Sequence, residues 1–318
     1  MKRHRPELFS PMIPVAKIKY IRSLQQKKFR RQHGVFVAEG EKIVWELVQA
    51  ATFGGGNAAG GGMIGGNAAG AGSPASSKAA GGGADQGLFG LECICALQEW
   101  MDRNGKLLPA GLDTHIVSPA ELGRISGLST PNQVLAVVRT PEYQWSPQEL
   151  WGGQTLVLEN IQDPGNMGTI IRTADWFGIR TVFCSPDSAD VFSPKVIQSS
   201  MGSFLRVKAV YTDLPALMEE IPYEHQVYGA FLDGEDVFSV TPARPAILII
   251  GNESRGISIE LLPSISRAVM IPRYRSQGGA EAGNRTESTE TAPEVGAESL
   301  NASVAAGILM AWLTRERG

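Results

Sequence analysis

Carboxamide, carboxylate and guanidinium groups occur at three separated points of the 318-residue sequence, each beside a segment with the pattern of a buried strand or a closely packed helix. Such groups can hold a polar substrate by hydrogen bonds and stabilise negative charge that develops in a reaction. The side chains with this potential are Asn166, Arg172, Glu253, Ser299 and Asn301. Each alone has an ordinary explanation as a helix cap, a surface acid or a turn residue, but their joint occurrence at strand ends favours a common site.

The elements next to these residues should bring them together. Apolar runs at 155–159 and 246–250 predict buried strands, and a polar, glycine-bearing turn follows each of them. We expect Asn166 just before a helix over 168–177 and Ser258 as a helix N-cap. The remaining expected elements are strands at 181–184, 206–210, 227–231 and 268–271 and a helix at 194–201. This alternation predicts an α/β fold with a mostly parallel sheet, whose ligands bind at the carboxyl ends of the strands.

Residues 15–140 have the composition of a smaller α/β domain of their own. A helix is expected over 15–32, with apolar residues on one side and basic residues, Arg30 among them, outside. Strands at 35–38, 91–97, 115–117 and 134–138 follow, and Ser118 with Glu121 predicts a capped helix start. The proline- and glycine-containing segment 141–153 is expected to be a linker, and residues 154–318 form the second domain.

Three segments lack the pattern of packed structure. Residues 1–14 are basic and rich in proline and predict a loose arm. The tract 53–87 consists almost wholly of Gly, Ala, Asn and Ser, so we expect a disordered insertion. A glycine-rich phosphate-binding loop is the alternative, but no strand precedes the tract and no Lys-Ser/Thr follows it. The polar segment 273–297 predicts a second, flexible insertion close to the candidate site.

Charge and cysteine content limit the class of protein. The net charge is −3, yet residues 1–31 contain ten Lys or Arg and one acid, which indicates a polyanion partner or else a solvated arm. Three cysteines without metal-ligand spacing predict reduced, structural thiols and no metal site. No apolar run approaches the ~18 residues of a membrane span, so we expect a cytoplasmic protein with no membrane partner.

Residues 154–312 resemble the SpoU (TrmH) family of RNA ribose methyltransferases, within the SPOUT superfamily. The likeness rests on three motifs in family order: 166–172, Gly251-Asn252-Glu253-Ser254-Arg255-Gly256, and Ile271-Pro272 with 299–303. Residues 15–140 are similar to the RNA substrate-binding domain that often precedes this fold. The sequence departs from the family in the length of the segment between Pro272 and Ser299, which is longer here.

The resemblance implies a C-terminal parallel-sheet domain with a trefoil knot. It implies S-adenosylmethionine as cofactor, held largely by backbone groups of Gly251, Ile271 and Leu300, and a homodimer formed through the knot region. Arg172 would hold the ribose or its phosphate and stabilise the developing alkoxide, because its pKa above about 12 makes it a poor base.

The remaining roles also follow from the resemblance. Asn166 and Asn301 would orient the sugar and Arg172, Glu253 would fix Arg172 or accept a hydrogen bond from RNA, and Ser299 would support the loop. The expected reaction is methylation of a ribose 2′-hydroxyl in structured RNA, with ribosomal RNA favoured over transfer RNA. A non-catalytic RNA-binding protein is the alternative, whereas a nicotinamide-dependent enzyme is disfavoured because G-x-G-x-x-G is absent after the first strand of this domain.

Overall fold

A computed structural model describes residues 13–53, 89–222, 224–273 and 299–315. The chain divides into two compact units, Met1–Glu142 and Tyr143–Gly318, called the N-terminal and C-terminal units below. Nearly all of the expected arm 1–14 and of the expected insertions 53–87 and 273–297 lies outside the described residues.

The N-terminal unit is a mixed sheet with helices on it. Its elements are α1 Val15–Ser23, α2 Lys27–His33, β1 Val35–Glu39, α3 Glu41–Phe53, β2 Leu91–Ala96, α4 Gln98–Asn104, a 3₁₀ turn Gly105–Leu107, β3 Asp113–Ile116, α5 Pro119–Ile125 and β4 Val134–Arg139. The strand order is β1-β4-β2-β3, in which β4 runs antiparallel to both neighbours and β2 pairs in parallel with β3. Helices α1 and α5 pack on one face of this sheet through Ile18, Ile21, Leu122 and Ile125.

The single helix expected over 15–32 is wrong, because the chain bends between α1 and α2. Gln26 has an extended backbone (φ −96°, ψ 133°) that interrupts the helical path. Arg30, expected outside, is 5% exposed. Its guanidinium donates to the carbonyls of Leu24 and Gln25 at 3.0 and 2.9 Å, so the buried charge satisfies groups that the bend leaves without helical partners.

The C-terminal unit contains a six-stranded sheet in which every pairing is parallel, in the order β10-β8-β9-β5-β6-β7. Its elements are α6 Pro147–Trp151, β5 Gln154–Leu158, α7 Pro164–Trp176, β6 Thr181–Cys184, α8 Pro194–Ser200, a 3₁₀ turn Ser203–Leu205, β7 Lys208–Tyr211, α9 Leu214–Glu219, β8 Gln226–Asp236, β9 Ala246–Ile250, a 3₁₀ turn Leu262–Ser264, β10 Arg267–Met270 and α10 Ala302–Thr314. The expected α/β fold with a parallel sheet is confirmed.

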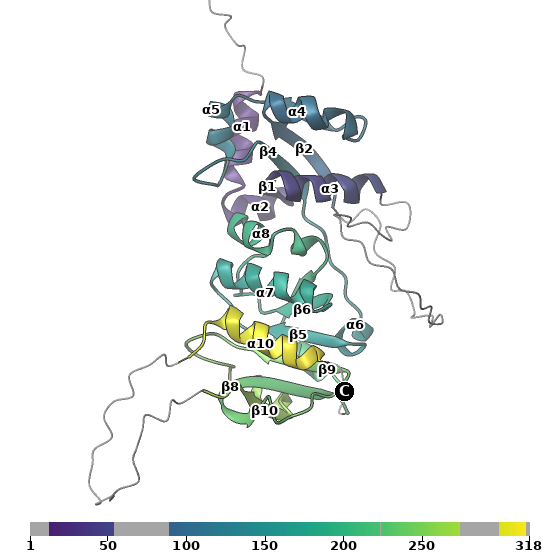
Figure 1. Ribbon diagram of the computed structural model, residues 1–318, viewed down its shortest axis with the longest axis vertical. Helices are drawn as coiled ribbons and strands as arrows, with labels where there is room; N and C mark the ends of the chain where they lie inside the picture. Colours follow the sequence, from purple (N-terminus) through teal and green to yellow (C-terminus); the bar gives the residue numbers. More distant parts are fainter. Residues whose placement is uncertain (1–12, 54–88, 223, 274–298, 316–318) are drawn as a thin grey trace, which may run out of the picture. The chain divides into compact units, whose positions relative to one another are not determined.

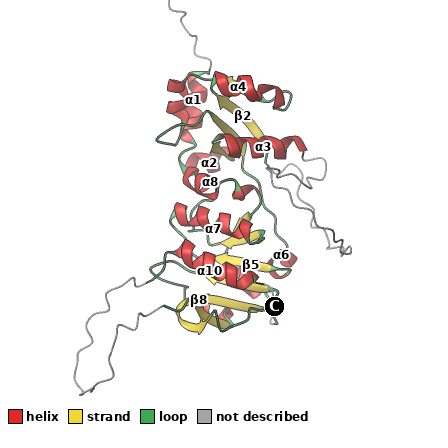
Figure 2. Ribbon diagram, in the orientation of Figure 1, coloured by secondary structure: helices red, strands yellow, loops and turns green. Residues whose placement is uncertain are grey.

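Both faces of this sheet are covered, which explains the continuous apolar runs. Val157 and Ile249 point into a core shared with α6 and α9. Because side chains alternate along a strand, Leu156 and Leu248 point to the opposite face. There α7 lies between α8 and α10 (Figure 1), and Figure 2 shows these helices in red beside the yellow strands.

Two local expectations need correction. The segment expected to be a linker contains α6, and its Leu150 is fully buried in the core of the C-terminal unit. Ser258 is not a helix N-cap, since only the short 3₁₀ turn follows; its backbone N–H donates to Glu159 Oε2 at 2.8 Å instead. The trefoil knot stays a prediction, because residues 274–298, which join β10 to α10, are outside the described part of the chain.

The three cysteines are free and buried, as expected for structural thiols. Burial raises the pKa of the Cys184 thiol to about 12, so the group stays protonated and unreactive near neutral pH. Among the described residues, no helix is long and apolar enough to cross a membrane.

Candidate active site

The sheet topology brings the three polar stretches to one place. Strands β5 and β9 are neighbours with Leu158 opposite Ile250, so the loops that follow them leave the sheet side by side. The loop after β5 leads into α7, and α10 packs beside α7 in the same layer (Figure 1). The first turns of α7 and α10 therefore face the loop that contains Glu253.

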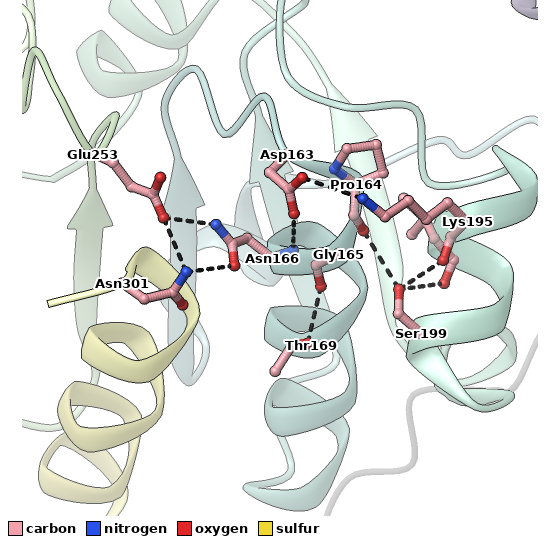
Figure 3. A network of polar contacts seen from close by, with 10 residues as sticks. Asp163, Pro164, Gly165, Asn166, Thr169, Lys195, Ser199, Glu253 and Asn301 are labelled. Carbon is pink, nitrogen blue, oxygen red and sulfur yellow. Dashed lines mark hydrogen bonds and ion pairs between the residues drawn. The ribbon is translucent and has the colours of Figure 1, made fainter.

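Asn166, Glu253 and Asn301 form a hydrogen-bonded group, called the amide–carboxylate cluster below (Figure 3). Asn166 Nδ2 donates to Glu253 Oε1 at 2.6 Å, and Asn301 Nδ2 donates to the same oxygen at 3.2 Å. Asn301 Nδ2 also donates to Asn166 Oδ1 at 2.9 Å. Three side chains separated by 48 to 135 positions along the sequence thus fix one another.

Asn301 has no hydrogen-bonding capacity left on its amide nitrogen. Both Nδ2 hydrogens are used within the cluster. Its Oδ1 caps α10, accepting from the backbone N–H of Ser303 and Val304 and from the Ser303 hydroxyl. The expectation that Asn301 orients a substrate directly therefore gives way to a positioning role. Asn166 retains one Nδ2 hydrogen and is the amide able to donate outward.

Glu253 has one oxygen engaged and one available. Oε1 also accepts the backbone N–H of Ala302 at 2.9 Å, whereas Oε2 makes no hydrogen bond to a described residue. The carboxylate borders a depression of about 340 Å³. Its lining residues are Asn160, Ile161, Gln162, Asp163, Asn166, Asn252, Glu253, Ser254, Arg255 and Ala302. A free carboxylate oxygen in a polar depression can accept a hydrogen bond from a bound hydroxyl.

Helix α7 begins earlier than the sequence pattern predicts, and its cap places Asn166. Asp163 is the N-cap and accepts the Asn166 backbone N–H at 2.8 Å, with Pro164 in the first helical position. This hydrogen bond, followed by the ion pair with Lys195, lowers the pKa of Asp163. Asn166 therefore lies in the first turn rather than before the helix. The Asp-Pro pair was the available signal for this start.

The loop after β9 is held by Asn252, which belongs to the second motif but is not among the expected site residues. Its Nδ2 donates to the Asn160 carbonyl at 2.9 Å, which ties the loops after β9 and β5 together. Its backbone pairs with Gly256 in both directions. A Cβ at Gly251 would lie 2.3 Å from the Gly256 carbonyl, so this close approach excludes any side chain there.

Two expected site residues do not join the cluster. Arg172 is exposed on α7 and makes no hydrogen bond or ion pair with any residue that the structure describes, so the expected pair with Glu253 is not formed. Arg172 lies six positions after Asn166, which turns its side chain roughly 120° away around the helix axis. Ser299 is exposed and likewise has no hydrogen bond within the described residues.

The residues expected to hold a cofactor lie at the ends of β9 and β10 and before α10. Gly251 and Ile271 are half-buried and Leu300 is 45% exposed. Their backbone amides and carbonyls make no hydrogen bond within the described part of the chain. Unpaired backbone groups beside the ends of these three elements are available to a ligand. Within the described ranges, no group of three His, Cys, Asp or Glu side chains could hold a metal ion.

Comparison with known protein families finds one match within each unit. The SpoU rRNA Methylase family matches residues 153–278, and the MRM3-like substrate binding domain matches residues 16–52. The 23S rRNA (guanosine-2′-O)-methyltransferase RlmP of Bacillus subtilis is 30% identical over 64% of this chain and 73% of its own length.

Solved structures agree over nearly the whole chain. A structure from Porphyromonas gingivalis, assigned to the TrmH family of RNA methyltransferases, is 29% identical with a TM-score of 0.68 and covers 95% of this chain and 98% of its own. An S-adenosylmethionine-bound rRNA methyltransferase from Sinorhizobium meliloti shares the fold at 22% identity, with a TM-score of 0.66 and 94% coverage of both chains.

Proposed function

Since this chain belongs to the SpoU family of RNA methyltransferases, we propose that it transfers a methyl group from S-adenosylmethionine to a ribose 2′-hydroxyl, with ribosomal RNA as the favoured substrate. The observation that carries the proposal is the amide–carboxylate cluster, in which three distant motif residues meet beside a polar depression. RNA is the chemically expected substrate because the 2′-hydroxyl distinguishes it from DNA.

The chain offers groups that fit the cofactor. Gly251, Ile271 and Leu300 present backbone donors and acceptors without partners among the described residues, as needed to hold a molecule with both adenosine and amino-acid parts. Bound S-adenosylmethionine supplies an electrophilic methyl group on a sulfonium. The methyl acceptor must then be brought in line with that methyl, which is chiefly a positioning task.

The cluster supplies that positioning on the ribose side. Glu253 Oε2 accepts a hydrogen bond from the 2′-hydroxyl and draws its proton away from the attacking oxygen. The remaining Nδ2 hydrogen of Asn166 donates to a neighbouring sugar oxygen. Asn301 and the Ala302 amide hold Glu253 Oε1, so Oε2 keeps its direction without reorganising during the reaction.

Arg172 supplies positive charge for the developing alkoxide or for an adjacent phosphate. Its guanidinium stays protonated and cannot serve as the base. Arg172 has no hydrogen bond or ion pair within the described residues of one chain, so its partner in this role is another molecule. That molecule is the RNA or a second copy of the protein.

A homodimer is part of the proposal. Trp176, four residues after Arg172 and so on the same face of α7, is 84% exposed, and Val304 on the adjacent α10 is 50% exposed. A tryptophan left almost entirely in water is typical of an interface anchor. A second copy packed over α7 and α10 would cover both side chains and enclose Arg172.

The proposal is tested by incubating the protein with methyl-labelled S-adenosylmethionine and, separately, ribosomal and transfer RNA. We expect label in 2′-O-methylnucleosides from ribosomal RNA after complete digestion. Label confined to transfer RNA would overturn the preferred substrate. Absence of cofactor binding by folded protein in calorimetry would refute the enzyme and leave the non-catalytic RNA-binding alternative.

A further inference from the structure

The bend between α1 and α2 forms an open hollow of about 370 Å³ on the N-terminal unit. It is lined by Lys19, Arg22, Ser23, Gln25, Gln26 and Phe29, and is called the corner groove below. All six residues come from one continuous stretch of chain. Its volume is within the ~300–1,000 Å³ range of sites that hold molecules of nucleotide size.

The segment of chain that lines the corner groove carries charge of one sign. Residues 15–33 contain seven Lys or Arg and neither Asp nor Glu, although the whole chain has a net charge of −3. The exposed basic side chains are Lys19, Arg22, Lys27, Lys28 and Arg31. Neither Lys19 nor Arg22 has a hydrogen bond or ion pair within the described residues. Positive groups without acidic partners attract a polyanion rather than stabilise the fold.

The bend that makes the groove is built into the fold. The buried guanidinium of Arg30 joins the Leu24 and Gln25 carbonyls, and Gln25 Nε2 donates to the Ile125 carbonyl of α5 at 3.4 Å. Leu24 itself is fully buried in the core of the unit. The groove is therefore preformed, so that a ligand need not supply the free energy to shape it.

The groove also contains groups suited to a nucleobase. Phe29 is half-buried at its wall with the Lys28 ammonium 5.9 Å from the ring centroid, and the exposed Gln26 carboxamide has no partner among the described residues. An aromatic ring can stack on a base, and a carboxamide can both donate to and accept from a base edge. A base can stack on a protein ring only where it is unpaired, because the bases of paired RNA are stacked on one another within the helix.

We propose that the corner groove binds an unpaired segment of the RNA substrate, with Lys19 and Arg22 on its phosphates and one base stacked on Phe29. This inference rests on the proposed function, because it identifies the structural class of RNA that the methyltransferase accepts. It assigns recognition of an unpaired strand to one face of the N-terminal unit.

The charge contribution is tested with Lys19→Gln/Arg22→Gln and a short unstructured RNA of mixed sequence. We expect the slope of log K against log salt to become shallower by about 1.4, two contacts at about 0.7 each for single strands. The matched control is Arg103→Gln/Lys106→Gln, which removes the same charges from α4 and the 3₁₀ turn after it. If both pairs of substitutions change the salt dependence equally, the groove contributes no more than general surface charge, and the inference is overturned.

The stacking contribution is tested with Phe29→Leu, which keeps apolar bulk in the half-buried position. We expect the affinity for unstructured RNA to fall about 5- to 140-fold, the range for loss of one base–aromatic stack, and binding of a fully paired duplex to stay unchanged. An equal loss of affinity for the unstructured RNA and the duplex would contradict the inference, and so would unchanged affinity for both. Preferential, groove-dependent binding of polyglutamate over RNA would point to an acidic protein partner and also overturn it.

Calorimetry with S-adenosylmethionine on the same variants separates this inference from the proposed function. If cofactor binding is normal and the groove variants bind RNA like wild type, the groove inference is refuted but the proposed methyltransferase function is not. Absent cofactor binding in wild type refutes the methyltransferase, while a groove-dependent loss of RNA binding would still support the groove.

Discussion

Two faces of helix α7 differ in whether their polar side chains have hydrogen-bond partners within the chain. On one face, Asn166 is hydrogen-bonded through its backbone to Asp163 and through its side chain to Glu253 and Asn301. On the other, Arg172 and Trp176 stand exposed, and Arg172 has no partner within the described residues. The first face, called the completed face below, has its polar groups hydrogen-bonded within the chain. The second, called the incomplete face, presents exposed side chains that are suited to contact another molecule.

The difference has a physical basis in the cost of ordering side chains. Groups that must aim at a reacting atom act best when they are fixed beforehand, which the shared Glu253 Oε1 achieves for two amides and a backbone N–H. A long arginine side chain loses rotamer freedom when it is fixed, at a cost of roughly 2 kcal/mol. That cost is better offset when RNA or a second subunit arrives and the charge is required.

Substitution of Arg172 is the strongest test of the incomplete face. We expect Arg172→Ala to reduce methyl transfer by about 10²–10³, the usual loss when one group that stabilises transition-state charge is removed. Binding of S-adenosylmethionine should be unchanged in calorimetry, because Arg172 is not among the residues expected to hold the cofactor.

Arg172→Lys serves as the control, since it keeps the charge but not the two-pronged guanidinium. Partial recovery by lysine indicates an electrostatic role, and none indicates bidentate binding of phosphate. Wild-type turnover in the alanine variant would remove Arg172 from the mechanism and leave the amide–carboxylate cluster as the whole site.

Glu253 tests the completed face. Glu253→Ala removes the acceptor for three donors, so we expect activity to fall by about 10², within the range for loss of a general base or acid. The free energy of unfolding, measured with a chemical denaturant, should fall by only about 1–2 kcal/mol, because the freed donors can hydrogen-bond to water.

The isosteric change Glu253→Gln separates the two carboxylate oxygens. Its amide oxygen can still accept the three donors at the Oε1 position, while the Oε2 position becomes a donor. Activity as low as in the alanine variant, with wild-type stability, would support proton acceptance by Oε2. Near-normal activity would show that Glu253 only holds Asn166 and Asn301.

Substitution of Trp176 tests whether a second copy of the protein covers the incomplete face. We expect Trp176→Glu to weaken self-association by at least about 10-fold, consistent with loss of one interface anchor, as measured by sedimentation or light scattering over a concentration series. Phe238→Glu is the matched control, because Phe238 is also highly exposed (63%) but lies just beyond β8, outside this face. An unchanged monomer–dimer equilibrium in the tryptophan variant would leave RNA as the partner for Arg172.

The motif residues predicted from the sequence include all three members of the cluster, Asn166, Glu253 and Asn301, but they also include Arg172 and Ser299, which do not join it. The direction of each amide was not predictable: only the geometry shows that Asn301 uses both Nδ2 hydrogens within the protein. The bend at Gln26 was missed for a related reason. Arg30 occupies a position that hydrophobic periodicity assigns to solvent, yet it is buried and donates to the carbonyls of Leu24 and Gln25 at the bend.

The smallest effect tests how the completed face is placed. Asp163→Ala removes the α7 cap and should cost about 1 kcal/mol of stability, as should Asp213→Ala, which removes the equivalent cap of α9. Only the first should also lower methyl transfer, because Asn166 depends on the first turn of α7.

The Asp163 pKa is lowered in the folded state, so its stabilisation is present above the unfolded pKa and is lost as pH falls through the folded value. Urea unfolding across acidic pH should therefore show wild type and Asp163→Ala converging at low pH. A constant difference would mean that the Asp163 charge contributes nothing, and equal activity in both cap variants would mean that the cluster positions Asn166 without the cap.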